Sequence, residues 1–496
     1  MRAALAAVWL ASALLCASAA VARDDAKPPN ILLIVTDQHH HRALGAAGEP
    51  VVQTPSLDRL ASQGIRFTAG YSNYPVCGPA RYAMFTGHYP TELGTFDNEV
   101  APRPGFRHIQ SYLADAGYFT ASVGKLHYAP YGETHGFEHV YHHEFLIDAS
   151  GISHYAPWLA MRLRERGLPP PPPLLEPSKD WYLTVSGLTG TNPLPEELTA
   201  EAWTTDKALR MIARAQAEQR PFFVHASYFP PHHPYVPLPK YLDLYRDAEM
   251  KLPHSFYAAP GAKPFGGLSE ADFREIRRHY FGSVSQVDHQ IGRLLDGLDA
   301  LGLAGDTLVF FVSDHGDLMG EFRLLTKSEP YEGSIRIPFL VRWPGRIEPG
   351  RVSGAPVSLV DVLPTILDAA GIPIPPQLRG QSILPLARGE ETSPGERNAY
   401  ALEVSVKPFR FLVVREERWK LTCRPRVDGS CEYRLVDLVA DPDELDDRST
   451  DPAARAHRDR LAAKLDAFWR RESAFVPSGP LPTRLPRARI DLPVKN

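Results

Sequence analysis

The sequence has few cysteines, no excess of charge of one sign and no internal repeat. Its 496 residues include only four cysteines, too few for a disulfide scaffold and without the close paired spacing of a zinc site. The 54 basic and 58 acidic residues give a net charge of −4, which excludes a global basic field for nucleic acid or anionic membrane. Apolar (44%) and charged (23%) residues occur at globular levels, which excludes a disordered chain.

Long apolar runs are also scarce, and the one that could span a bilayer lies at the N-terminus. Residues 3–22 are uncharged and rich in Ala and Leu, with small residues at two candidate cleavage sites, Ala17-Ser18-Ala19 and Ala20-Val21-Ala22. This pattern predicts a signal peptide over residues 1–22. An uncleaved membrane anchor is the alternative, and the polar Arg23-Asp24-Asp25 that follows favours cleavage. We therefore expect an exported protein, periplasmic or secreted, with no membrane attachment after signal removal, in an oxidising compartment.

Four aliphatic or β-branched runs, separated by helical patterns, organise most of the chain. They cover residues 30–36, 117–123, 222–227 and 307–313. Runs of this kind are typical of strands buried on both faces, and their alternation with helices predicts an α/β domain with a mostly parallel central sheet flanked by helices. Ser269, with Asp272 three residues later, predicts the start of a long helix. We expect this domain to span residues 28–389.

Two regions depart from the α/β pattern. Residues 146–195 contain five consecutive prolines and little periodicity, which predicts a loop-rich insertion. In residues 390–496, short apolar runs at 411–415, 419–422 and 433–436 precede a helical pattern around 455–469. This order predicts a smaller C-terminal domain with an antiparallel sheet and a helix. Cys423 and Cys431 flank a turn-forming stretch between two of these strands, so we expect a disulfide between them.

Polar residues follow each predicted strand of the main sheet, where ligands bind in open α/β sheets. They are Asp37 and Gln38, Lys125 and His127, His232, and Asp314 and His315. Two carboxylates, an amide oxygen and an imidazole suit a hard divalent cation, Ca²⁺ first, with Mg²⁺ or Mn²⁺ possible. Consecutive residues cannot all face one ion, so we interpret His39-His40-His41 as a polar loop at the pocket rim. His142, His143 and His233 are expected at the rim or surface.

Cys77 begins the segment Cys77-Gly78-Pro79-Ala80-Arg81, and Pro79 suits the first turn of a helix. A helix N-terminus favours an anion beside this cysteine. The pattern Cys-x-Pro-x-Arg resembles the modification signature of the type I sulfatases, in which the cysteine is oxidised to formylglycine by a dedicated modifying enzyme. Residues 117–127, the segment 312–316, and Lys327 with residues 331–338 are similar to further motifs of that family.

The resemblance implies an alkaline phosphatase-like fold and a role for each matching residue. The formylglycine hydrate formed from Cys77 would be the nucleophile, and Asp314 its base. The metal set would be Asp37, Gln38, Cys77, Asp314 and His315. Lys125, Lys327 and Arg81 would supply positive charge near the sulfuryl oxygens, Arg81 as a buttress. His232 would protonate the departing alkoxide, and His127 would deprotonate the covalent hemiacetal sulfate.

One departure from the commonest family pattern leaves the substrate open. Many sulfatases carry two aspartates after the first strand, whereas this chain has Asp37-Gln38. Together with His315, this pair resembles the branch that contains choline sulfatase and the phosphonate monoester hydrolases. The Lys125-x-His127 pair resembles the sulfatases, which keep it, rather than the phosphonate hydrolases. We therefore expect an exported sulfatase acting on a small-molecule or glycan sulfate ester. The alternatives are a phosphodiesterase or phosphonate monoester hydrolase, or a non-catalytic protein that binds sulfated glycans with Cys77 unmodified.

Overall fold

The structure is a computed structural model that describes residues 27–144, 153–171, 184–258, 264–390, 397–404, 409–426, 428 and 430–477. The predicted signal peptide, residues 1–22, lies outside the described residues. Within the described part of the chain, no helix combines the length and the apolar character needed to span a membrane.

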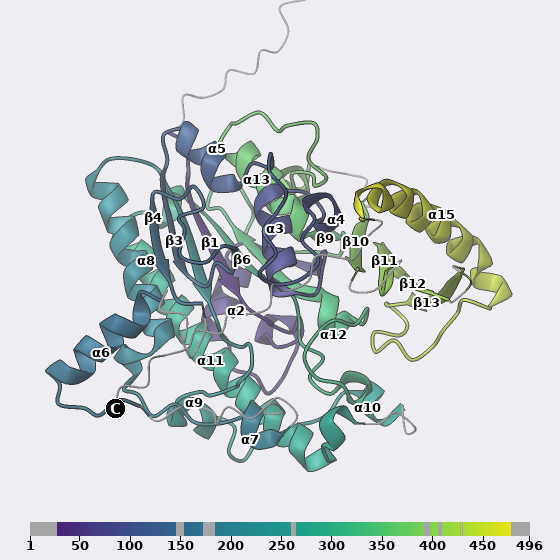
Figure 1. Ribbon diagram of the computed structural model, residues 1–496, viewed down its shortest axis with the longest axis horizontal. Helices are drawn as coiled ribbons and strands as arrows, with labels where there is room; N and C mark the ends of the chain where they lie inside the picture. The colour runs from purple at the N-terminus through teal and green to yellow at the C-terminus, as the bar shows by residue number, and fades with distance from the viewer. Residues whose placement is uncertain are drawn as a thin grey trace, which may run out of the picture.

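A nine-stranded sheet forms the centre of the molecule (Figure 1). Its strand order is β4-β3-β5-β1-β6-β7-β2-β8, with β9 beside β2. The five strands from β4 to β6 are parallel, and β7 runs antiparallel to both of its neighbours. The strands are β1 (Asn30–Thr36), β2 (Ile65–Tyr71), β3 (Phe119–Gly124), β4 (His139–His142), β5 (Phe222–Tyr228), β6 (Thr307–Ser313), β7 (Arg336–Arg342), β8 (Arg351–Ser353) and β9 (Val357–Ser358). The predicted mostly parallel sheet is confirmed.

Helices cover both faces of this sheet, because its central strands are apolar on both sides. In β1, Ile31, Leu33 and Val35 pack into one hydrophobic core, and Leu32 and Ile34 pack into another. The first core also contains side chains of α3 (Cys77–Thr86), α5 (Ile109–Asp115), α13 (Val362–Ala369) and α14 (Leu384–Arg388). The second contains side chains of α2 (Pro55–Ser62), α8 (Ala200–Ala217) and α11 (Glu270–Ala300). Such two-sided coverage is typical of parallel sheets.

Local sequence explains where the important helices begin. The side chain of Ser269 accepts from the Asp272 backbone N–H and the Asp272 carboxylate accepts from the Ser269 N–H, so the predicted capping box of α11 is confirmed. Helix α3 begins at Cys77, with Pro79 in its first turn, where a missing N–H costs nothing. The short helices are α4 (Pro90–Leu93), α7 (Val185–Leu188), α9 (Pro239–Asp243), α10 (His254–Ala258) and α12 (Glu332–Ile335).

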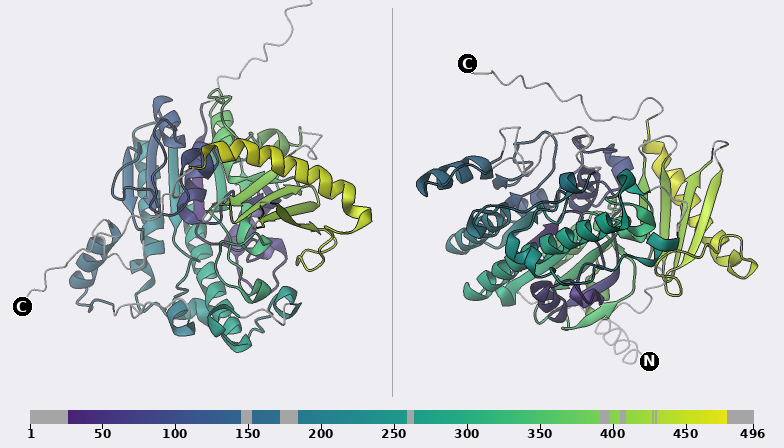
Figure 2. Two further views of the ribbon diagram at one scale, coloured as in Figure 1. Left: turned by 45° about the vertical axis from the view of Figure 1, so that its right-hand side comes forward. Right: turned by 90° about the horizontal axis from the view of Figure 1, so that it is seen from below.

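A second, four-stranded antiparallel sheet lies beside the central sheet, with α15 packed across it (Figure 2). It consists of β10 (Ala399–Glu403), β11 (Phe411–Glu416), β12 (Trp419–Pro425) and β13 (Cys431–Asp437), and α15 spans Arg455–Glu472. The predicted sheet-plus-helix architecture is confirmed, although β10 was not predicted. The predicted disulfide between Cys423 and Cys431 is confirmed as well. The core of this sheet includes Tyr74 and Ala83 from the region around α3, so it contacts the helix that begins at Cys77.

The segment 146–195, in which a loop-rich insertion is predicted, contains two helices among its described residues, α6 and the short α7. Helix α6 spans Tyr155–Glu165. Pro157 fits its first turn, and only Tyr155 and Leu163 are buried in it. So narrow a buried face gives little hydrophobic periodicity, which explains why the pattern did not indicate a helix.

Candidate active site

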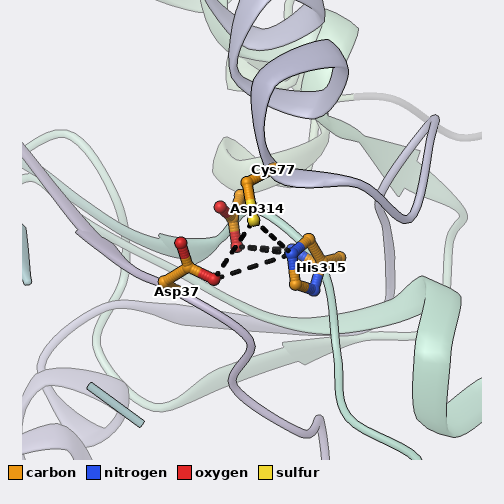
Figure 3. A group of neighbouring side chains, drawn as sticks. All are labelled: Asp37, Cys77, Asp314 and His315. Carbon is orange, nitrogen blue, oxygen red and sulfur yellow. Dashed lines mark hydrogen bonds and ion pairs between the residues drawn. The ribbon is translucent and has the colours of Figure 1, made fainter. Parts of the chain in front are cut away.

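The carboxyl ends of β1 and β6 bring two aspartates together. Thr36 and Ser313 end these strands as paired residues of the parallel ladder, so Asp37 and Asp314 lie side by side. Cys77, the first residue of α3, faces them, with its Sγ 3.6 Å from Asp37 Oδ1. His315 Nε2 lies 3.2 Å from the same sulfur and 3.6 Å from an oxygen of each aspartate. Figure 3 shows these four side chains converging from three elements.

Two buried cations balance the two carboxylates. Arg81, one turn along α3 from Cys77, donates through Nε to Asp314 Oδ2 at 2.8 Å, and its Nη2 lies 3.4 Å from Asp37 Oδ2. Lys125 Nζ lies 2.5 Å from the same Asp37 oxygen. Burial raises the pKa of Asp37, but Lys125 and the other nearby cations outweigh it and hold the pKa well below its ordinary value. Asp37 is therefore ionised at neutral pH.

The position of Lys125 depends on a glycine at the end of β3. Gly124 has φ +92°, and a Cβ added there would lie 1.9 Å from the Ser227 carbonyl oxygen of β5. No other residue fits so close to the neighbouring strand. The chain therefore turns at Gly124 and directs Lys125 toward Asp37.

The buried donor set fits a hard divalent cation. Asp37, Cys77, Asp314 and His315 each place a ligand atom within 4.8 Å of the others. His315 Nδ1 donates to the Gly316 carbonyl at 2.9 Å, which leaves the Nε2 lone pair directed at the site, as metal-bound histidines require. Gln38, the fifth predicted ligand, has an Oε1 that is buried and accepts no hydrogen bond. Four of the predicted ligands, Asp37, Cys77, Asp314 and His315, are thus brought together.

Lys327 connects the cysteine to His232. Its Nζ donates to Cys77 Sγ at 2.9 Å and lies 3.1 Å from both His232 Nε2 and His315 Nε2. His232 Nδ1 donates to the carbonyl oxygen of the next residue, which leaves Nε2 as the acceptor toward Lys327. Lys327 and His232 are only partly buried, whereas the aspartates are fully buried. Lys327 and His232 are therefore the more solvent-accessible members of this cluster.

The two predicted proton-transfer histidines are neutral before substrate binds. Burial, and then the charge of Lys327, lower the pKa of His232 well below its ordinary value. Burial and Lys125 do the same for His127. His127 has φ +57°, a conformation that costs a non-glycine residue free energy. Glu144 stabilises it by accepting from the backbone N–H groups of Leu126 and His127 at 3.1 and 2.9 Å.

The sequence profile of the sulfatase family matches residues 29–372. The chain belongs to the sulfatase family. A second profile, described as the C-terminal part of N-sulphoglucosamine sulphohydrolase, matches residues 320–471. A choline-sulfatase of Rhizobium meliloti (strain 1021) is 30% identical over 457 residues, which cover 85% of this chain and 83% of that protein. An ulvan-active sulfatase of Formosa agariphila is 30% identical over 447 residues, covering 86% and 78% of the two chains.

Solved structures share the fold of this sulfatase. A protein solved in complex with its substrate D-glucosamine-2-N,6-O-disulfate superposes with a TM-score of 0.73 at 22% identity, covering 90% of this chain and 99% of that one. The phosphonate monoester hydrolase of Agrobacterium radiobacter gives 0.72 at 25% identity, covering 90% and 96%. The predicted likeness to both choline sulfatase and the phosphonate hydrolases is confirmed, and so is the prediction of a sulfuric ester hydrolase.

Several histidines of the sulfatase do not lie where the sequence predicted them. His39, His40 and His41 are all buried, not on a polar rim. His39 Nε2 pairs with the Ala43 carbonyl, and His40 Nε2 lies 3.2 Å from Glu321 Oε1. His142 and His143 are buried as well. Imidazole rings that find hydrogen-bond partners tolerate burial, and the number of polar residues in a loop does not reveal such partners.

Three residues around the site escaped the sequence reasoning. Asn98 Oδ1 accepts from the N–H of Gly78, the residue after Cys77. Glu144 holds His127, and Asp317 contacts Gln38. Asp317 follows His315-Gly316 directly, so its position in that motif was a usable signal. Glu144 and Asn98 lie in loops, where no periodicity or motif marks them.

Proposed function

We propose that this protein is an exported sulfatase that hydrolyses a sulfate monoester through a formylglycine hydrate formed from Cys77. The observation that carries the proposal is the juxtaposition of the Cys77 sulfur, at the start of α3, with Lys327 Nζ at 2.9 Å and the Asp37–Asp314 pair. A nucleophile at the position of Cys77 would have the positive charge of Lys327 on one side and the two aspartates on the other. This arrangement suits attack on an anionic ester.

The chain's own residues would position and polarise the ester. Asp37, Gln38, Asp314, His315 and the modified Cys77 would hold one divalent cation, Ca²⁺ in our proposal. That ion would supply Lewis-acid polarisation and lower the pKa of the nucleophile's hydroxyl. Lys327 and Lys125 would bind the terminal sulfuryl oxygens. Arg81 would not reach the substrate, because its hydrogen bonds go to Asp314, Asp37, Ser227 and the Lys125 carbonyl.

The proton transfers would use Asp314 and the two histidines. Asp314 would accept the hydroxyl proton as that oxygen attacks sulfur and the bond from sulfur to the ester oxygen breaks. His232 would give the departing alkoxide its proton. Because its pKa is depressed in the free site, the bound sulfate's negative charge would have to raise that pKa first. His127, already neutral, would take the proton of the remaining hydroxyl, which expels sulfate and restores the aldehyde.

The identity of the released alcohol is a separate part of the proposal. Relatives of this chain include proteins described as choline-sulfatase and ulvan-active sulfatase, and a structural neighbour was solved with a glucosamine disulfate. These names favour a small-molecule or glycan sulfate ester here. A phosphodiesterase or phosphonate monoesterase is the second candidate, favoured by the phosphonate hydrolase neighbour at 25% identity.

The experiment that tests the proposal compares paired substrates on the same leaving group. Purified enzyme, with the state of Cys77 established by peptide mass, is assayed against an aryl sulfate and the matching aryl phosphodiester and phosphonate. We expect loss of sulfur from the Cys77 peptide and a kcat/KM at least about tenfold higher for the sulfate, a difference of about 1.4 kcal/mol. Faster hydrolysis of the phosphodiester or phosphonate would support the second candidate. An intact thiol with no turnover would support a non-catalytic binding protein.

A further inference from the structure

The side-chain amide of Gln38 can help to hold a cation in only one of its two orientations. An amide offers an oxygen, which ligates a hard cation, and an NH₂ group, which does not. The two ends have nearly the same shape, so hydrogen-bond partners alone decide which end faces the site. In this structure Nε2 is the end that carries hydrogen bonds, and Oε1 is buried without one.

Of the groups that contact the nitrogen end, the Asp317 carboxylate is the one that fixes the orientation. Gln38 Nε2 lies 2.5 Å from Asp317 Oδ2 and 3.0 Å from His233 Nδ1. An imidazole nitrogen can donate or accept according to its tautomer, so His233 tolerates either end of the amide. An ionised carboxylate only accepts. Turning Gln38 over would place its oxygen 2.5 Å from a carboxylate oxygen, which is electrostatically unfavourable in a buried site.

Asp317 is itself held in place. Its side chain is fully buried. Oδ1 accepts from the backbone N–H groups of Met319 and Thr326, at 3.1 and 2.9 Å, and Oδ2 accepts from Tyr235 Oη at 2.6 Å as well as from Gln38. Backbone donors cannot change into acceptors, so the Oδ1 side has a fixed polarity. Thr326 precedes Lys327, so the same carboxylate also holds the start of the lysine's loop.

The backbone of Gln38 is fixed independently of Asp317. Gln38 has φ +64°, its N–H donates to Asp314 Oδ1, and its carbonyl accepts from Tyr280 Oη at 2.9 Å. The side chain therefore leaves a fixed point of the backbone. The backbone therefore leaves undecided only which amide atom of Gln38, Oε1 or Nε2, contacts Asp317.

We propose that Asp317 is a positioning residue that turns the oxygen of the Gln38 amide toward the cation site. The inference rests on the proposed metal site and adds to it a residue that does not contact the ion. Asp317 acts through Gln38, and the polarity of the bond between them is the quantity to test.

Reversing that polarity gives a sharp experiment. In Asp317→Asn the new oxygen is expected to remain on the side of the two backbone N–H groups, which places the NH₂ group toward Gln38. Gln38 then turns its oxygen to Asn and its nitrogen to the cation. Adding Gln38→Glu supplies an acceptor for that NH₂ group and leaves a carboxylate oxygen for the ion. The double variant therefore restores the bond with donor and acceptor exchanged.

Binding of Ca²⁺, Mg²⁺ and Mn²⁺ is measured by titration calorimetry on the metal-stripped enzyme, without substrate. We expect Asp317→Asn to weaken binding of the preferred ion by about 10- to 100-fold, the range for residues that orient metal ligands. Gln38→Glu with Asp317→Asn should return to within about threefold of wild type or bind more tightly. Tyr235→Phe is the matched control: it removes a hydrogen bond from the same Asp317 oxygen but keeps the contact with Gln38, and should change affinity less than threefold.

Each outcome decides a different question. Wild-type affinity in Asp317→Asn would overturn this inference and leave the metal site standing. A double variant that binds metal as weakly as Asp317→Asn would also overturn the inference. Misfolding caused by Asp317→Asn would give this same result. Loss of affinity in Tyr235→Phe equal to that in Asp317→Asn would assign the effect to the loop and not to Gln38. Wild-type enzyme that binds none of the three ions would overturn the proposed metal site itself.

Discussion

Replacing Arg81 by methionine should destabilise the metal-free protein severely, because Arg81 is the buried counterion of two aspartates. Its side chain is 1% exposed, and both Asp37 and Asp314 are fully buried. Removing one partner of a buried ion pair leaves an uncompensated charge and costs about 3–5 kcal/mol. Lys125 still neutralises Asp37, so most of the loss should arise at Asp314. We expect a decrease of about 3–5 kcal/mol in the free energy of unfolding.

The chain offers a control with similar geometry and different burial. Arg59 pairs with Asp296 at 2.7 Å, close to the 2.8 Å of Arg81 with Asp314, but the side chains of this pair are 38% and 64% exposed. Exposed pairs contribute about 0–1 kcal/mol. Arg59→Met should therefore be nearly neutral. Urea unfolding of both variants and wild type, in chelator at pH 7, measures the difference.

A second substitution tests whether Asp314 is the source of the loss. Asp314→Asn in the Arg81→Met background removes the uncompensated charge, so it should recover part of the lost stability although it is destabilising alone. The reasoning would be refuted if Arg81→Met cost less than about 1 kcal/mol, the level of an exposed pair. It would also be refuted if Asp314→Asn lowered the free energy of unfolding of the Arg81→Met variant by as much as it does in the wild type.

Further outcomes follow from the same contacts. Glu144→Ala should lower kcat with a smaller effect on KM, because the backbone N–H groups of Leu126 and His127 both lose their acceptor; equal loss in both parameters would contradict this. Burial lowers the pKa of His108 to about 4, whereas in the unfolded chain it is about 6.5. Below pH 6.5 the side chain therefore takes up a proton on unfolding, and the free energy of unfolding should fall from pH 6.5 toward pH 4. His108→Asn should flatten that slope in urea titrations. Reducing the Cys423–Cys431 disulfide removes a cross-link that restricts the unfolded chain. The chain-entropy estimate gives a loss of about 2.5 kcal/mol in the free energy of unfolding. Two free thiols in the unreduced, denatured protein would contradict the disulfide.

Periodicity predicted the central sheet because its strands are buried on both faces and leave long aliphatic runs. The strand at 30–36 was predicted with the bounds that the structure gives. Strand β2, by contrast, contains the sequence IRFTAGY with two half-buried positions, and its mixed pattern gave no signal. Strand β7 begins in a motif that was interpreted through Lys327, so its antiparallel pairing with β6 was not predicted.

The first layer of the candidate site was predictable because its residues follow strands or stand in a dense motif. Strand ends converge whatever the intervening loops do, and Asp37 and Asp314 meet for that reason, whereas Cys77 was found through its motif. The residues that hold His127 and Gln38 were not identified from the sequence. Glu144 accepts a backbone hydrogen across 18 positions of sequence from a loop, where no spacing marks it. Asp317 contacts Gln38 across 279 positions, and only its place directly after His315-Gly316 could have indicated it.

Sulfate release by wild-type enzyme and by Cys77→Ala tests the central claim most directly. Both proteins are incubated with an aryl sulfate and with Ca²⁺, and free sulfate is measured by ion chromatography, with circular dichroism to confirm that the variant is folded. The account predicts sulfate release by the wild type and less than a few per cent of that rate in Cys77→Ala. A folded Cys77→Ala variant that releases sulfate at a rate close to wild type would contradict it.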